Sequence, residues 1–231
     1  MADQQLFVVR RCDGFYRFWH DVTDPAPLRE AHAAYDRLTH SETHSTTPDD
    51  VEYYDVFAAD PLPGWQNEPA PLIRRLHPHD AAAIEAHLLG LDLADRRLRF
   101  FREATDAHLR AYVRDIDWTH ARLFGAIRAD RVVGMAEALF DHAAMPRHAE
   151  VAVSVDGDAR GRGLGRYLTS RAVAYAALLG ARQSCFAFLR ENRPMQRIIR
   201  TLGGLVDMDD LIGVIRTADA ALTAADQRLA A

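Results

Sequence analysis

The chain is poor in cysteine and lacks a long hydrophobic run, and these absences exclude several classes of protein. Cys12 and Cys185 are the only cysteines and lie far apart in apolar stretches, which favours two reduced, buried thiols and predicts a cytoplasmic protein. No apolar stretch approaches the roughly 20 residues that cross a bilayer. The N-terminus MADQQLFVVRR also lacks the basic start and apolar middle of a signal peptide. We therefore expect no membrane partner.

An excess of positive charge and a pattern of metal ligands are also missing. The chain has 28 Lys+Arg against 33 Asp+Glu, a formal net charge of -5, so nucleic acid is not an expected partner. Among the 11 histidines, His40 and His44 stand four residues apart, but they lie in a Ser/Thr-rich stretch without a third ligand at metal spacing. We expect no bound metal.

Residues 1–58 predict a small ββαβ module, and the sequence assigns it no role. The segments QLFVVRRC and FYRFWHDV flank Asp13-Gly14, a dipeptide typical of hairpin turns. Asp24 and Pro25 suit the start of a helix, and VEYYDVF is typical of a strand. Residues 59–71 hold four prolines and one glycine, which predicts a linker.

Residues 72–217 alternate between strand and helix patterns, which predicts a second, larger domain. The strand patterns are PLIRRL, two segments around the turn Ala129-Asp130, AEVAVSV, SCFAFLR and LIGVIRT. The helix patterns run from a cap at Asp80 through AAAIEAHLLGL, over about 94–101 and 106–113, from Gly163 to Leu179, and over PMQRIIRTLG. An Ala-rich tail, 218–231, follows this domain.

The stretch DARGRGLGRYL sets glycines and arginines alternately between a predicted strand and a predicted helix. Such a junction brings unpaired backbone N–H groups to the positive end of the helix dipole, which favours an anion. Glycines let the backbone wrap the anion, and arginines add positive charge from the sides. The residues concerned are Arg160, Gly161, Arg162, Gly163, Leu164, Gly165 and Arg166. We expect the ligand to be a diphosphate.

Two common phosphate-binding motifs do not fit this stretch. A P-loop places a lysine and then Ser or Thr after its last glycine, whereas Arg166-Tyr167 follows here. A dinucleotide-binding fold uses the spacing GxGxxG and an acidic residue at the end of the next strand. Here the spacing is GxGxG, and SCFAFLR ends in Arg190.

The stretch resembles instead the acetyl-CoA loop of the GCN5-related N-acetyltransferases, the GNAT superfamily. Arg160, Gly163 and Gly165 fill that family's pattern, and Val155 stands five residues before Arg160, where the cofactor strand should end. Downstream, ENRPMQRIIRTLGG is similar to the second CoA-contacting segment of bacterial protein acetyltransferase domains, and LDLADRRLRFF to their early helical region. In the second segment, the matching residues are Asn192, Met195, Leu202 and Gly203.

The resemblance covers about residues 72–217 and implies a fold and a reaction. The fold would be α/β, with a mixed, mainly antiparallel sheet flanked by helices. The reaction would move an acetyl group from acetyl-CoA, as co-substrate, to a primary amine on a small molecule or a protein lysine. The sequence leaves the acceptor, the length of the acyl chain and a homodimer open.

The resemblance also implies roles for single residues. The strand AEVAVSV would separate from its neighbour, so that backbone groups near Val153 and Val155 pair with pantetheine and a strand N–H polarises the thioester. Glu150 at the start of this strand is the candidate base. Glu137 is a weaker candidate that we expect to face solvent or an arginine. Asn192 would cap its helix or contact CoA.

Many members of the family carry a tyrosine in the helix after Asn192, which protonates the leaving thiolate. This sequence has Ile198 and Ile199 there. An alternative function is therefore a non-catalytic acyl-CoA-binding regulatory module.

Overall fold

The computed structural model describes residues 7–13, 18–21, 53–58, 65, 70–141 and 148–216, the first three ranges as strands. These strands are β1 (Phe7–Asp13), β2 (Phe18–Asp21) and β3 (Tyr53–Ala58), and they form an antiparallel sheet in the order β2-β1-β3. The three predicted strands of the N-terminal module are thus present. The helix predicted after Asp24 and the Ala-rich tail lie outside the described residues.

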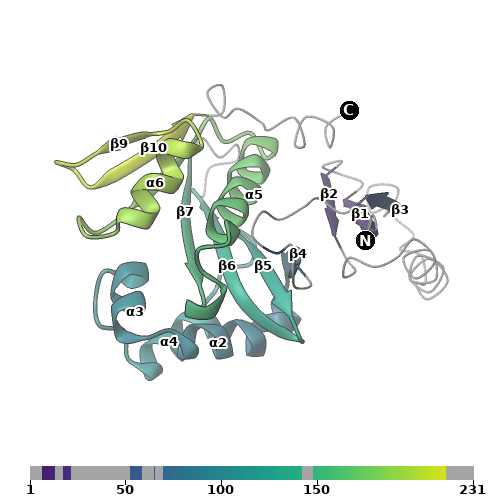
Figure 1. The fold of residues 1–231 in the computed structure, drawn as a ribbon, viewed down its shortest axis with the longest axis horizontal. Helices are drawn as coiled ribbons and strands as arrows, with labels where there is room; N and C mark the ends of the chain where they lie inside the picture. The colour runs from purple at the N-terminus through teal and green to yellow at the C-terminus, as the bar shows by residue number, and fades with distance from the viewer. Residues whose placement is uncertain are drawn as a thin grey trace.

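A seven-stranded sheet with the order β4-β5-β6-β7-β8-β10-β9 forms the centre of the larger domain (Figure 1). Its strands are β4 (Leu72–Leu76), β5 (Ala121–Arg128), β6 (Arg131–Phe140), β7 (His148–Val155), β8 (Gln183–Ala187), β9 (Leu205–Asp207) and β10 (Ile212–Arg216). All neighbouring strands are antiparallel except β7 and β8. This confirms the predicted mixed, mainly antiparallel sheet. β9 was not predicted, and the strand in SCFAFLR ends at Ala187.

The helices of this domain follow the predicted order. They are α2 (Ala81–Gly90), α3 (Leu93–Phe100), α4 (Asp106–Arg114), α5 (Leu164–Leu178) and α6 (Arg193–Thr201), with short 3-10 turns at Pro78–Asp80 and Gly157–Ala159. Within the described ranges, no helix combines the length and the hydropathy of a membrane span.

Asp80 is the N-cap residue of α2, as predicted, but its side chain does not act as the cap. Its side chain makes no capping hydrogen bond to the helix. The carboxylate instead accepts hydrogen bonds from Arg74 Nη1 at 2.8 Å, Arg74 Nη2 at 2.6 Å and the His77 N–H at 2.8 Å. Asp80 therefore ties β4 to the turn that precedes α2.

Two apolar clusters pack on opposite faces of the sheet. Phe124 and Ala136 belong to a cluster that includes the apolar side of α5, whereas their neighbours Leu123 and Met135 belong to one with α2 and α4. Because successive side chains of a strand point to opposite faces, helices cover both faces. One side of α5 is apolar and buried, since Leu164, Leu168, Ala172 and Tyr175 are at most 1% exposed and the partly buried Leu179, just after the helix, packs against the same cluster.

The parallel pair β7–β8 separates partway along its length. The strands pair only at His148 with Gln183, Ala149 with Ser184 and Glu150 with Cys185, whereas β7 stays paired with β6 through Val155. Residues 151–155 therefore present one edge of β7 that no described strand covers. We call the point of separation, at Glu150 and Cys185, the fork. Figure 1 shows β4 to β6 on one side of β7 and α6 with the β9–β10 pair on the other.

Candidate functional site

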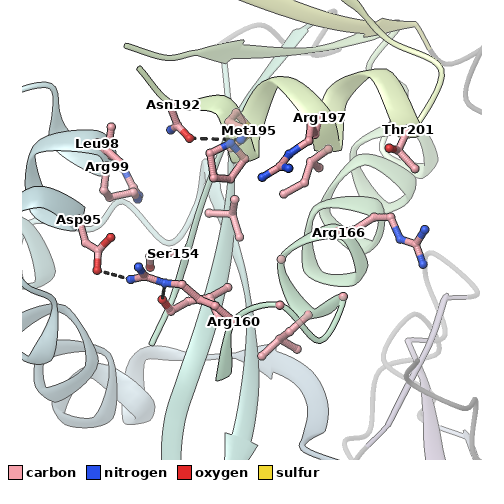
Figure 2. Close-up of a pocket in the computed structure, with 18 of the residues that line it drawn as sticks. Asp95, Leu98, Arg99, Ser154, Arg160, Arg166, Asn192, Met195, Arg197 and Thr201 are labelled. Atoms are coloured by element: carbon pink, nitrogen blue, oxygen red, sulfur yellow. Dashed lines mark hydrogen bonds and ion pairs between the residues drawn. The ribbon is translucent and has the colours of Figure 1, made fainter. Parts of the chain in front are cut away.

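A cavity of about 500 Å³ opens beside the unpaired part of β7. Its walls come from β7, from α3, from the glycine loop with the start of α5, and from α6 (Figure 2). Nine residues that the sequence assigned to the site line it: Val153, Val155, Arg160, Gly161, Gly163, Leu164, Gly165, Arg166 and Asn192. Glu150 and Arg162 do not line it.

The glycine loop presents free backbone donors to this cavity. Gly161 and Gly163 have φ angles of 75° and 82°, a backbone conformation that L side chains rarely adopt, and Gly163 is the N-cap of α5. The N–H groups from Gly163 to Arg166 donate to no carbonyl or side chain among the described residues. Free donors at the positive end of a 15-residue helix favour an anion there.

Arg160 links two walls of the cavity. Its Nε donates to the Val155 carbonyl oxygen at 2.9 Å, and its Nη2 forms an ion pair with the Asp95 carboxylate of α3 (Figure 2). Arg160 thereby holds the start of α3 against the end of β7. In contrast, Arg166 on α5 and Arg197 on α6 have no hydrogen bond or ion pair to any described residue.

Arg162 points to the segment predicted as a linker. Its guanidinium carbon lies 4.6 Å from the ring centroid of Trp65, and that of Arg128 lies 5.1 Å from the same ring. Trp65 is 4% exposed and belongs to the cluster under α5. The Arg162 side chain is therefore directed to Trp65 and not into the cavity. Its predicted contact with a diphosphate stays a prediction.

Asn192 caps α6, as one of its two predicted roles requires. Its Oδ1 accepts a hydrogen bond from the Met195 N–H at 3.1 Å. Because Asn192 and Met195 also line the cavity, the cap fixes the first turn of α6 in the cavity wall.

Glu150 lies at the fork and is exposed. It is the last β7 residue that pairs with β8, three positions before Val153, which is about 10 Å along an extended strand. Burial raises the pKa of the neighbouring Cys185 thiol; a hydrogen bond from Gln183 opposes the rise, and the charge of Glu150 adds to it. The Glu150 carboxylate therefore lies close to the Cys185 thiol, at the point where β7 and β8 separate.

Glu137 faces an arginine, which confirms one of its two expected environments. Its Oε2 accepts hydrogen bonds from Arg99 Nη2 at 2.7 Å and from the Tyr112 hydroxyl, and Arg99 Nη2 lies 2.9 Å from Tyr112 Oη. Burial raises the pKa of Tyr112 far above its ordinary value; Arg99 opposes this rise and Glu137 adds to it. Tyr112 therefore stays protonated and donates to Glu137.

A buried polar chain behind the cavity was missed by the sequence reasoning. Ser154 lines the cavity, and its Oγ is hydrogen-bonded to His87 Nε2 at 2.8 Å. On the other side of the imidazole ring, His87 Nδ1 lies 2.8 Å from Asp156 Oδ1. The second contact has the distance of an ion pair, which it forms only with a charged imidazole, and His87 Nδ1 makes no hydrogen bond to a described residue. His87, at the buried side of α2, thus contacts both residues that flank Val155. Among the described residues, no group of three His, Cys, Asp or Glu side chains could hold a metal ion.

Comparisons with known proteins give one family match and several solved structures with a similar fold. Residues 91–203 match the acetyltransferase (GNAT) family. The GNAT domain of PAT from S. lividans aligns with a TM-score of 0.56 at 18% identity, over 68% of this chain and 93% of that chain. Spermidine N-acetyltransferase from Vibrio cholerae, in complex with CoA and spermine, aligns with a TM-score of 0.51 at 17% identity, over 64% and 96%. Structural likeness at such low identity shows a shared fold.

Proposed function

The chain belongs to the GNAT acetyltransferase family through the domain at residues 91–203, and we propose that it transfers an acetyl group from acetyl-CoA to a primary amine. The amine is carried by a small molecule or a protein lysine. The observation that supports this proposal most is one continuous cavity, which joins the free amides of the glycine loop to the open edge of β7.

In this proposal, the two ends of the cavity bind different parts of acetyl-CoA. The diphosphate accepts hydrogen bonds from the N–H groups at the start of α5, and Arg166 adds charge beside it. Pantetheine carries amide groups, so it pairs with the open edge of β7 at Val153 and Val155 as an added strand would. The thioester then lies toward the fork, and a strand N–H polarises its carbonyl.

In this proposal, the reaction takes place near the fork, where Glu150 lies. The amine nitrogen attacks the thioester carbon, Glu150 takes the proton that the amine loses, and the C–S bond breaks to release the CoA thiolate. Glu150 is favoured over Glu137 as the base, because Glu137 Oε2 already accepts from Arg99 and Tyr112. No acid for the thiolate is assigned, since isoleucines occupy positions 198 and 199.

The test combines calorimetric titration of CoA with an acetyl-CoA consumption screen over amines. The chain contains no lysine, since all 28 of its basic residues are arginine, so acetylation of its own lysines cannot contribute background. Glu150→Gln should abolish acetyl transfer and keep the affinity for CoA. The matched control is Glu85→Gln on α2, which alters a carboxylate paired with Arg110 outside the cavity wall and should leave both measurements unchanged.

Two outcomes would contradict the proposal. Full activity in Glu150→Gln would remove Glu150 from the mechanism. Binding of CoA without acetylation of any amine would support a regulatory acyl-CoA-binding module instead, the function that the missing tyrosine favours.

A further inference from the structure

Arg99 lies beside the open part of β7, between the glycine loop and the fork. Along α3, Asp95 pairs with Arg160, which binds the carbonyl of Val155. One helical turn later, Arg99 binds Glu137, whose partner on β7 is Ala152. Adjacent partners in an antiparallel pair project to the same face, so the Arg99 guanidinium lies over the stretch of β7 that leads to Glu150. Figure 2 shows Arg99 in the cavity wall formed by α3.

The guanidinium of Arg99 is held from several sides. Its Nη2 donates to Glu137 and Tyr112, and its central carbon lies 4.8 Å from the ring centroid of Phe100. The side chains of Arg99 and Glu137 are only 10% and 12% exposed. A buried cation fixed by a carboxylate and a phenol loses little freedom when it binds a further partner.

Arg99 still has unused donors in this fixed position. Neither Nη1 nor Nε donates to any described residue, and Nε is fully buried. Buried polar groups normally find hydrogen-bond partners, so an arginine that lines a cavity with a free Nη1 is prepared for an acceptor in that cavity.

On the basis of the proposed function, we propose that Arg99 is a further catalytic residue, whose Nη1 donates to the carbonyl oxygen of the bound acyl thioester. When the amine attacks, the carbonyl π electrons move to this oxygen, and the Arg99 N–H stabilises the oxyanion that forms. The oxyanion then collapses, the C–S bond breaks and the CoA thiolate leaves, while Glu150 holds the proton from the amine. Arg99 keeps its own proton throughout. Glu137 and Tyr112 are positioning residues that fix its guanidinium.

The charge of the cluster favours a carbonyl over a permanent anion. Glu137 balances the positive charge of Arg99, so a carboxylate or phosphate at Nη1 would face a nearly neutral pair. A carbonyl oxygen costs little to desolvate in the ground state, and it gains most from a fixed N–H when it becomes negative in the transition state.

The kinetic test compares two arginines of the same helix. Arg99→Met should lower kcat about 100-fold, the loss typical of removing one oxyanion donor, with little change in the affinity for CoA, which has no acyl carbonyl. Arg97→Met is the matched control, because Arg97 is 53% exposed, pairs with Glu191 and does not line the cavity. It should leave kcat unchanged. An unchanged kcat in Arg99→Met would overturn the proposal.

A spectroscopic test separates a carbonyl contact from a structural role. Infrared difference spectra of acetyl-CoA labelled with ¹³C at the carbonyl, bound without an acceptor, should show a carbonyl stretch at lower frequency than in solution. Arg99→Met should lose this shift, and Arg97→Met should keep it. If Arg99→Met does not fold, Arg99→Lys keeps a cation for Glu137 but has no second arm to reach the carbonyl, and it should also lose the shift.

The two proposals fail in different ways. If no amine is acetylated, the proposed function fails, while the carbonyl shift in the binary complex still decides whether Arg99 binds the thioester. A shift that is the same in wild type and Arg99→Met would overturn the role of Arg99 and leave the transferase assignment standing.

Discussion

At the scale of single residues, the glycines before α5 differ in what a side chain would meet. A Cβ on Gly157 or on Gly161 would have no heavy atom within 4 Å, so both positions have room. Only Gly161 has a positive φ, 75°, which L residues adopt at a cost of about 1–2 kcal/mol. The backbone of the loop, and not its packing, is therefore what requires glycine at this position.

The matched pair Gly161→Ala and Gly157→Ala tests this conclusion. Gly161→Ala should lower the free energy of unfolding by about 1 kcal/mol and weaken CoA binding, because the loop amides shift to relieve the strain. Gly157→Ala should change neither quantity. Chemical denaturation and calorimetric titration of both variants provide the measurements, and equal behaviour of the two variants would contradict the argument.

At the scale of elements, the junction between β4 and α2 depends on one buried carboxylate. Burial alone would raise the pKa of Asp80, but hydrogen bonds from Arg74 and from the His77 N–H hold it below its ordinary value of 3.8. A carboxylate with a lowered pKa stabilises the fold above the pKa of the unfolded chain, and this contribution is lost as pH falls through the folded pKa.

Asp80→Asn should therefore lower the free energy of unfolding by about 2 kcal/mol at neutral pH, as expected when charged hydrogen bonds are lost. The difference from wild type should stay constant down to about pH 4 and shrink at lower pH, as Asp80 of the wild type becomes protonated. Denaturant unfolding of both proteins, from neutral pH to below about pH 4, measures this difference in the free energy of unfolding. Glu85→Gln, which removes an exposed pair at 3.4 Å, should give less than about 0.5 kcal/mol at every pH. A deficit in Asp80→Asn that persists at low pH would contradict the argument.

Local patterns predicted the elements better than they predicted the contacts between them. The apolar side of α5 and the turn at Ala129-Asp130 each depend on residues close together in the sequence. The two turn residues have φ angles of 47° and 57°. β9 was missed because three residues are too short to show an alternation. Asp80 was correctly predicted as the N-cap residue of α2, but its side chain does not bond the helix, because the sequence does not show that Arg74 turns toward it.

The same limit applies to the site. The glycine loop and Asn192 were found because each motif is contiguous in the sequence. The Arg99–Glu137 contact joins residues 38 positions apart in the sequence, and the His87–Ser154 contact joins residues 67 positions apart. Such pairs meet only once the helices lie on the sheet, so no local signal could identify them.

At the scale of the whole molecule, the segment between the two sheets contributes to the larger core. Trp65 lies within the predicted linker, 59–71, yet it packs in the cluster under α5 and beside Arg162 of the glycine loop. The domain that carries the cavity therefore includes a residue before Leu72, where the strand patterns begin.

Two fragments that differ by eight residues test whether the domain extends back to Trp65. A fragment of residues 62–217 should be more stable to denaturant than one of residues 70–217 by about 3 kcal/mol, the usual scale for losing a buried tryptophan. Trp65→Ala in the full chain should reproduce the loss. If both fragments unfold at the same denaturant concentration, Trp65 contributes nothing to this core.

The central claim, that the amides before α5 bind the diphosphate of CoA, has one direct test. The chain contains 13 glycines, so selective ¹⁵N-glycine labelling gives few enough amide signals to assign. Saturation with CoA should shift the signals of Gly161, Gly163 and Gly165 and leave those of Gly90 and Gly180 in place. A titration in which CoA binds but none of the three loop glycines shifts would contradict the account.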